Sequence, residues 1–262
     1  MRTSCHSPDR IKVMFDDDAA VGDGGLVLPM LLADRLGLRE LVDKNLKLGD
    51  APGRANVGLK ATALVASLLA GGDSIDDADA LRAGQCPAVV GQWIPAPSTL
   101  GTFLRSISGG HARQLDAVSR VLLVRAFQAG AGPGDAPFTL DLDSSICETY
   151  GLAKQGGAKF TCTHVRGYHP LLAVMAGTGD VVHARLRGGN ANSGRGAASF
   201  LVETFARVRA AGATGQMTLR ADSGFYSHKV VDACRAGGVR SSITVRLNKG
   251  LRRLIDAIPE EE

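Results

Sequence analysis

Two aspartates stand two residues apart in the stretch PFTLDLDSS, residues 137–145. The other residues are mostly apolar or β-branched, which predicts a strand. Because successive side chains of a strand point to opposite faces, Asp141 and Asp143 share one face, roughly 6 to 7 Å apart. Like charges at this distance oppose each other's ionised form, and a bound metal ion is the commonest way to offset them. The spacing therefore indicates a metal site.

A second acidic position occurs in the stretch LRADSGF, where Asp222 stands at the point at which an apolar strand runs into Ser223-Gly224. Active-site residues of open α/β sheets lie at the carboxyl ends of strands. If the strands of Asp143 and Asp222 are neighbours, the two carboxylates can bridge two Mg²⁺ ions about 3.5 to 4 Å apart, as in two-metal phosphoryl transfer. The alternative is that Asp222 only caps the turn into the next helix.

The elements that must position these acids follow residue 137. Apolar runs bounded by turn residues predict strands at 138–145, 169–177, 180–188, 216–224 and 241–248, and amphipathic runs predict helices at 196–212, 227–238 and 250–258. The order β-β-β-α-β-α-β-α predicts an α/β fold with a mixed sheet and helices on both faces. This is the order of ribonuclease-H-like folds, in which the first and fourth strands are neighbours.

The first 130 residues are predicted to be mainly helical. Helical periodicity covers 26–46, 59–70 and 111–128, with shorter helices near 74–84 and 99–108. The stretch AGAGPGDAP, residues 129–137, has the composition of a linker. We therefore predict a helical N-terminal domain over residues 1–130 and a ribonuclease-H-like core, lacking its C-terminal part, over residues 131–262.

The charge of the chain is unevenly distributed. Residues 151–258 hold 16 Lys and Arg and five Asp and Glu, a net charge of +11, whereas the whole chain has +4. Such a segment can bind a polyanion, although it can also be a solvated face. Candidate contacts to a DNA backbone are Lys154, Lys159, Arg166, Arg185, Arg187 and Arg195, the last three in or beside the Gly-rich stretch 188–199.

Membrane insertion and secretion are not expected. The longest apolar run, residues 59–72, is too short to span a bilayer, and the N-terminus lacks a signal pattern. Five cysteines without a CxxC pair fit a reducing compartment better than a disulfide framework.

The chain resembles a known family, the DDE-type transposases of insertion sequences. The matching stretches are VMFDDDAAVGDGGLVLPMLLADRLGL, LLAGGDSIDDADALRAG, PSTLGTFLRSI, LDLDSS, YGLAKQGGAKF, GYHPLLAVMAGTGDVVHARLRGGNANS and LRADSGFYS. The resemblance implies DNA strand cleavage and transfer at the ends of a mobile element, with Mg²⁺ or Mn²⁺ as cofactor. It also implies a homo-oligomeric synaptic complex with element ends and target DNA, in the bacterial cytoplasm at the nucleoid.

The resemblance also assigns site residues. It places the first catalytic acid on Asp143 and the second on Asp222, while Asp141 either tunes the site or has a structural role. These enzymes need a third acid, usually Glu, on a helix well past the fifth strand. Here only Glu260, Glu261 and Glu262 follow, and a charged terminal run is usually solvated. We interpret the chain as a truncated copy.

Two alternatives stay open at this stage. The first is a non-catalytic DNA-binding fragment that inhibits a full-length relative by mixed oligomerisation. The second is a phosphatase of the haloacid-dehalogenase type, because the strand ends in DxDx[ST]. In that case Asp141 is the nucleophile and Asp143 the acid/base, but the downstream acidic pair needed for Mg²⁺ is missing.

Overall fold

The computed structural model describes residue 17 and residues 19–50, 53–150 and 158–258. Contacts divide the chain into two units, one of residues 1–35 and 50–105 and one of residues 36–49 and 106–262. The predicted boundary at residue 130 stays a prediction. The structure adds that the segment 36–49 and the long helix before residue 130 belong to the unit that holds the sheet.

The first unit is helical. Its elements are η2 (Gly24–Leu26), α1 (Val27–Arg35), α3 (Val57–Leu69), η3 (Asp76–Arg82), α4 (Cys86–Val90) and α5 (Pro97–Ser106). Its core is a cluster of small and aliphatic side chains that includes Met30, Ala63, Leu81 and Leu100. The predicted helix at 74–84 is a 3₁₀ helix over Asp76–Arg82, and at its start the Asp77 carboxylate accepts hydrogen bonds from the backbone and hydroxyl of Ser74.

The single helix predicted over 26–46 is two helices in the structure, α1 and α2 (Leu38–Asn45). The break lies at Gly37, whose φ of 68° is left-handed and favours glycine. A Cβ atom there would also overlap the guanidinium of Arg125, which donates to the Leu36 carbonyl at 2.6 Å. Arg125 belongs to α6 (Gly109–Ala126), so α2 packs against α6 in the second unit.

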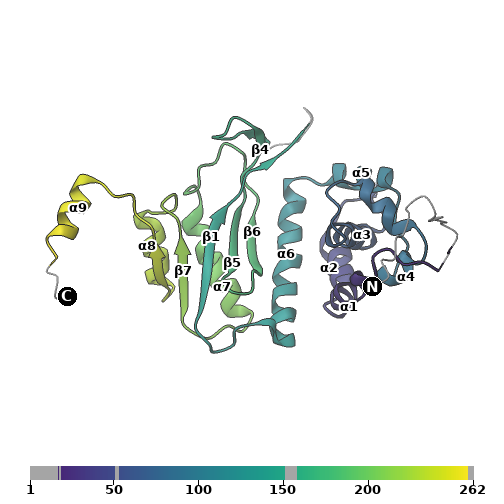
Figure 1. Ribbon diagram of the computed structural model, residues 1–262, viewed down its shortest axis with the longest axis horizontal. Coiled ribbons are helices and arrows are strands. Elements are labelled where there is room, and N and C mark those ends of the chain that lie inside the picture. The colour runs from purple at the N-terminus through teal and green to yellow at the C-terminus, as the bar shows by residue number, and fades with distance from the viewer. Residues whose placement is uncertain (1–16, 18, 51–52, 151–157, 259–262) are drawn as a thin grey trace, which may run out of the picture. The chain divides into compact units, whose positions relative to one another are not determined.

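The second unit is built on a five-stranded mixed sheet (Figure 1). Its strands are β1 (Phe138–Ser144), β5 (Leu171–Met175), β6 (Val181–Arg185), β7 (Met217–Ala221) and β8 (Arg240–Ile243), in the spatial order β6-β5-β1-β7-β8. β1, β5 and β6 are antiparallel neighbours, and β7 and β8 run parallel to β1. The predicted fold class is confirmed: an α/β fold whose strand order is that of ribonuclease-H-like sheets.

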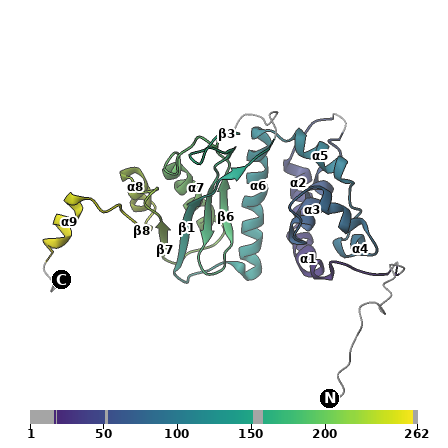
Figure 2. The same ribbon diagram turned by 45° about the horizontal axis from the view of Figure 1, so that its top comes forward.

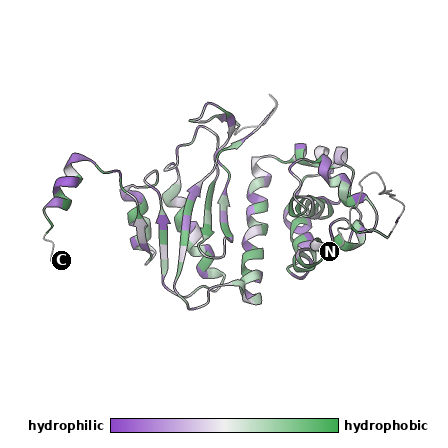
Figure 3. Cartoon of the chain, in the orientation of Figure 1, coloured by the Kyte–Doolittle hydropathy of each residue, from purple (hydrophilic) through white to green (hydrophobic). Residues whose placement is uncertain are grey.

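Helices α7 (Ala197–Ala210) and α8 (His228–Ala236) connect the parallel strands, and α9 (Lys249–Asp256) follows β8. Apolar side chains of α7 and α8, such as Phe200 and Val230, share one core with Leu140 and Leu219 of the sheet. In β1 every second side chain from Phe138 to Leu142 is buried, as the alternation of the sequence predicts. The strands are accordingly apolar in their interior and hydrophilic at the carboxyl end of β1 (Figure 3).

A second, three-stranded antiparallel sheet follows the carboxyl end of β1 and was not predicted. It consists of β2 (Cys147–Glu148), β3 (Lys159–Phe160) and β4 (Arg166–Tyr168), with β4 in the centre. β4 is labelled in Figure 1 and β3 in Figure 2. These strands are only two or three residues long, so they carry no readable alternation. Gly167 of β4 is required because a Cβ atom there would overlap the backbone of Cys147.

No helix among the described residues is long and apolar enough to cross a membrane.

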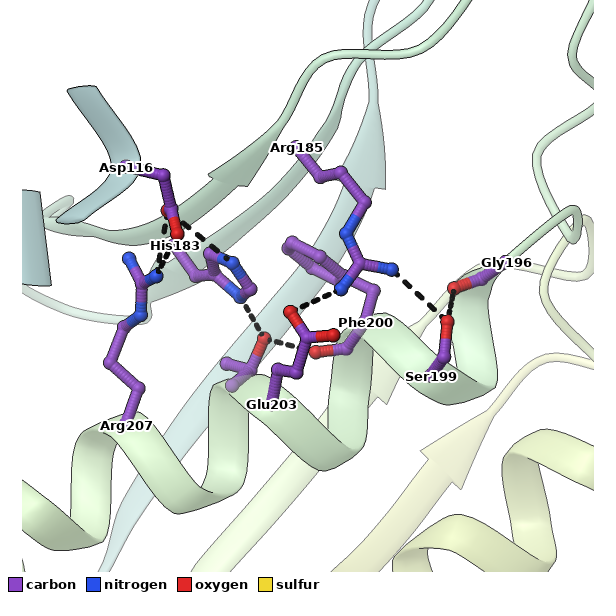
Figure 4. Close-up of polar contacts among 9 residues, drawn as sticks. Asp116, His183, Arg185, Gly196, Ser199, Phe200, Glu203 and Arg207 are labelled. Atoms are coloured by element: carbon purple, nitrogen blue, oxygen red, sulfur yellow. Dashed lines mark hydrogen bonds and ion pairs between the residues drawn. The ribbon is translucent and has the colours of Figure 1, made fainter. Parts of the chain in front are cut away.

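A buried polar cluster joins α6, α7 and β6 (Figure 4). Arg207 of α7 donates to both carboxylate oxygens of Asp116 of α6, at 2.6 and 2.7 Å. His183 of β6 stacks on the ring of Phe200, with the ring centroids 4.3 Å apart. Its Nδ1 lies 2.7 Å from the hydroxyl of Thr204. That hydroxyl donates to the carbonyl of Phe200, so Nδ1 carries the proton, while Nε2 lies 3.7 Å from Oδ1 of Asp116.

This cluster predicts that the second unit loses stability in acid. Burial, with the charge of Arg207 as the next cause, lowers the pKa of His183 from 6.5 to about 4, while Asp116 and Glu203 oppose the shift. The unfolded chain therefore takes up this proton first as the pH falls below 6.5. The contribution of His183 is complete above its unfolded pKa, and about 2 kcal/mol is lost by about pH 4.5.

Chemical denaturation of the wild type and of His183→Gln at about pH 7 and about pH 4.5 measures this effect. The variant has no imidazole to titrate, so its free energy of unfolding should fall less between the two pH values. Equal losses in both proteins would show that other groups carry the acid sensitivity.

Candidate functional site

The two predicted acids lie side by side at the carboxyl edge of the sheet. β1 and β7 are parallel neighbours, and their last registered pair is Leu142 with Ala221. Asp143 is the next residue along β1 and Asp222 is the residue that follows β7, and both are exposed. Neighbouring strands are about 4.8 Å apart. This register brings together two carboxylates that are 79 residues apart in the sequence.

Local backbone bonds fix one oxygen of each acid. The N–H of Ser144 donates to Oδ1 of Asp143 at 2.7 Å, and the N–H of Gly224 donates to Oδ1 of Asp222 at 2.9 Å. Among the described residues, Oδ2 of neither acid has a hydrogen-bond partner. Asp222 thus caps the turn that follows β7, which was the alternative to a catalytic role. Its second carboxylate oxygen is still available to another ligand.

Asp141 has a different environment. Its register partner on β7 is Arg220, whose Nε and Nη2 donate to the two carboxylate oxygens at 2.6 and 2.7 Å. The hydrogen bonds and charge of Asp141 raise the pKa of Arg220. The negative charge of Asp141 is therefore offset by a cation of the neighbouring strand, and the expected offset by a metal is not needed at this residue. The sequence analysis did not single out Arg220, although it directly precedes Ala221-Asp222.

The Gly-rich segment 188–196 borders the acidic pair on the side of Asp222. The hydroxyl of Ser193 lies 3.3 Å from that of Ser144, and a Cβ atom on Gly224 would come within 3.3 Å of the Ser193 Cβ. Arg187 supports the segment from within. Its Nη1 donates to the carbonyls of Asn192, Ser193 and Arg195 at 2.7 to 3.1 Å.

The comparison with known proteins gives the family. The profile of the family described as transposase DDE domain group 1 matches residues 3–262, nearly the whole chain. The chain belongs to this family. The resemblance noted in the sequence is thereby confirmed.

Solved structures of other transposases are distantly similar. The piggyBac transposase in a synaptic complex with hairpin DNA is 15% identical, with a TM-score of 0.41; the match covers 93% of this chain and 54% of that one. The Mos1 transposase in a paired-end complex with the left transposon end is 10% identical, with a TM-score of 0.28; the match covers 81% and 74%. This transposase-family chain thus spans about half the length of the piggyBac chain. No curated protein matches it in sequence.

Two side chains of this site could serve as ligands to a divalent metal. Asp143 and Asp222 supply carboxylate oxygens, the ligand type that Mg²⁺ and Mn²⁺ prefer. In the described part of the chain no three His, Cys, Asp or Glu side chains gather closely enough to hold a metal. Glu260, Glu261 and Glu262, considered as a third acid, lie outside the described residues.

The basic residues proposed for DNA fall into three groups. Lys154 lies outside the described residues. Arg185 and Arg187 are engaged within the protein: Arg185 pairs with Glu203 at 2.5 Å, and burial lowers the pKa of Arg187, whose Nε donates to the His169 carbonyl at 2.8 Å. The third group keeps some access to solvent. Lys159 and Arg195 are exposed, and Arg166 is half-buried, with Nε donating to the Ala158 carbonyl at 3.2 Å.

Proposed function

We propose that the chain carries the metal-binding part of a transposase that cleaves and joins DNA strands at the ends of an insertion sequence. The observation that supports this most is the register of β1 and β7. It gives Asp143 and Asp222 adjacent positions at one exposed edge, each with a carboxylate oxygen free of hydrogen bonds among the described residues. Family membership supplies the reaction class.

Mg²⁺ or Mn²⁺ held by these two acids would activate the attacking oxygen and stabilise the leaving oxygen of a phosphodiester. The residues of the chain provide the ligands and the fixed spacing. The backbone N–H groups of Ser144 and Gly224 orient the carboxylates, and the Asp141–Arg220 pair keeps a second acid of β1 neutralised. Preorganised ligands of this kind do not have to rearrange when the metal binds.

DNA would approach this edge from the side of the small sheet. Lys159 and Arg166 belong to that sheet, and Arg195 belongs to the Gly-rich segment that borders Asp222. Exposed cations of this kind attract phosphates without reading sequence. We include Lys154, Arg185 and Arg187 as weaker candidates. We also propose that copies of the chain act together, one at each element end.

A nicking experiment tests the proposal. The purified chain is incubated with a duplex that carries the terminal repeat of its own element, with Mg²⁺, with Mn²⁺ or with a chelator. We expect strand cleavage at the element end only when the metal is present. A single-strand break that also appears in chelator would contradict the proposed chemistry.

The alternative of a non-catalytic DNA-binding fragment is favoured by one observation, the lack of a third acid near the pair among the described residues. It predicts salt-dependent binding of the same duplex and no cleavage with either metal. Mixing the chain with a full-length relative then distinguishes an inhibitor from an inert binder. The phosphatase alternative is less favoured, because both oxygens of Asp141, its nucleophile, accept hydrogen bonds from Arg220.

The role of Asp141 can be separated from that of Asp143. Asp141→Asn leaves the Arg220 cation without its counter-charge beside Asp143 and Asp222. This cation repels a metal ion, so we expect Mn²⁺ affinity to fall several-fold, by up to about tenfold. The double variant Asp141→Asn/Arg220→Gln removes that cation and should return to within about threefold of the wild type. Titration calorimetry measures both. If the double variant stays as weak as the single one, Asp141 is itself a ligand.

A further inference from the structure

His169 is a buried histidine that neither the family resemblance nor the proposed chemistry uses. Only 6% of its surface is exposed. It stands between β4 and β5, and its backbone is bonded to the segment that follows β6: its N–H donates to the carbonyl of Arg187 at 3.1 Å, and its own carbonyl accepts from the Arg187 guanidinium. The position of the ring is therefore fixed on both sides.

Both ring nitrogens of His169 are bonded. Nδ1 lies 2.7 Å from the carbonyl oxygen of Ala191. Because a carbonyl only accepts, Nδ1 must carry the proton, and the neutral ring then accepts at Nε2. The hydroxyl of Ser144 lies 3.0 Å from Nε2. The imidazole thus joins the end of β1 to the Gly-rich segment 188–196.

The chain of contacts continues to both acids. Ser144 directly follows Asp143, and its N–H is the group that holds Oδ1 of that acid. The hydroxyl of Ser193 lies 3.3 Å from that of Ser144. Gly224, whose N–H donates to Oδ1 of Asp222, lies close to Ser193, because a Cβ atom added there would come 3.3 Å from the Ser193 Cβ. His169, Ser144 and Ser193 therefore link the end of β1 at Asp143 to a segment that passes close to the Asp222 turn.

We propose that His169 is a positioning residue of the metal site: through Ser144 and Ser193 it holds the end of β1 and the Asp222 turn at the separation that a divalent metal requires. This inference rests on the proposed function, since it concerns the same two acids. Groups that orient ligands in this way typically change metal affinity about 10- to 100-fold when removed.

Four variants of the full chain test the proposal, with Mn²⁺ as the probe. Ser144→Ala and Ser193→Ala remove one hydroxyl each. His169→Asn keeps an amide nitrogen near the place of Nδ1 and loses the bond to Ser144, whereas His169→Gln reaches towards Ser144. The matched control is Ser199→Ala, which removes a hydroxyl that bonds Arg185 and the Gly196 carbonyl, outside this chain of contacts.

We expect Mn²⁺ affinity, measured by calorimetry or electron paramagnetic resonance, to fall about tenfold in Ser144→Ala and His169→Asn. His169→Gln should retain more affinity than His169→Asn, and Ser199→Ala should bind as the wild type does. Melting temperatures are recorded in parallel, because a purely structural role would lower the melting temperature and leave affinity unchanged. In a cleavage assay the loss should disappear at saturating Mn²⁺.

Two results overturn the proposal, and they are distinguishable. If Asp143→Asn binds Mn²⁺ as tightly as the wild type, the metal site itself is wrong, and the positioning role falls with the proposed function. If Asp143→Asn abolishes binding while Ser144→Ala and His169→Asn stay within about twofold of the wild type, the metal site stands and His169 has no positioning role.

Discussion

Asp143→Asn and Asp222→Asn are each expected to abolish metal-dependent cleavage of element-end DNA. Each substitution removes one of the two carboxylates at the edge of β1 and β7 and leaves a neutral side chain of nearly the same size. Losing several kcal/mol of transition-state stabilisation by the metal corresponds to a rate loss of roughly 10³-fold. Mn²⁺ binding should weaken in parallel, while DNA binding at low salt should persist because the basic residues are unchanged.

The matched control is Asp180→Asn. Asp180 is an exposed acid in the turn between β5 and β6, and this turn lies at the end of β5 opposite to the one that pairs with Asp143. Asp180→Asn removes the same charge from the same unit but away from the acidic pair. Cleavage and Mn²⁺ affinity should therefore stay unchanged. Cleavage that survives both Asp143→Asn and Asp222→Asn would assign the chemistry to other residues.

The second large effect concerns stability. Asp116→Ala should lower the free energy of unfolding by about 2 to 3 kcal/mol, because it leaves the guanidinium of Arg207 unpaired in the core. The Arg207 side chain is only 6% exposed, against 38% for Asp116, and Nη1 of Arg207 has no hydrogen-bond partner among the described residues. Urea denaturation followed by circular dichroism measures the loss.

A control lies on α7, the helix that also carries Arg207. Glu203 of α7 pairs with Arg185, but its side chain is 62% exposed, so Glu203→Gln should cost less than about 1 kcal/mol. The double variant Asp116→Ala/Arg207→Met should recover part of the loss, because it removes the unpaired charge as well. A double variant less stable than Asp116→Ala would mean that Arg207 stabilises the core through packing of its apolar stem rather than through the ion pair.

The elements of the sheet unit were predictable from local patterns. Alternating burial in β1, the amphipathic periodicity of α7 and the cap at Ser227 of α8, whose hydroxyl accepts from the Val230 N–H, are all encoded in neighbouring residues. Strand lengths were less predictable. The strand expected at 241–248 ends at Ile243, because β8 pairs with β7 only as far as Ala221.

The small sheet and the polar contacts were not predictable in the same way. β2, β3 and β4 are short strands held by pairing with one another, and pairing partners cannot be read from one chain segment. The sequence places His169 at the start of the predicted strand 169–177, and it indicates Arg187 as a DNA contact because Arg187 adjoins the Gly-rich stretch 188–199. Their hydrogen bonds join segments that are 5 to 25 residues apart, and these exist only in the folded chain.

The sequence by itself determined the family and the chain order of the five strands of the main sheet, and it predicted the two acids, because apolar alternation, turn residues and the LDLDSS and LRADSGF stretches are local features. The tertiary structure alone decided which acids share an edge and which are neutralised. Parallel pairing of β1 with β7 sets Asp143 next to Asp222 and, two residues earlier, Asp141 opposite Arg220. The physical reason is that register is a property of two strands together: hydrogen bonding between their backbones fixes which side chains become neighbours.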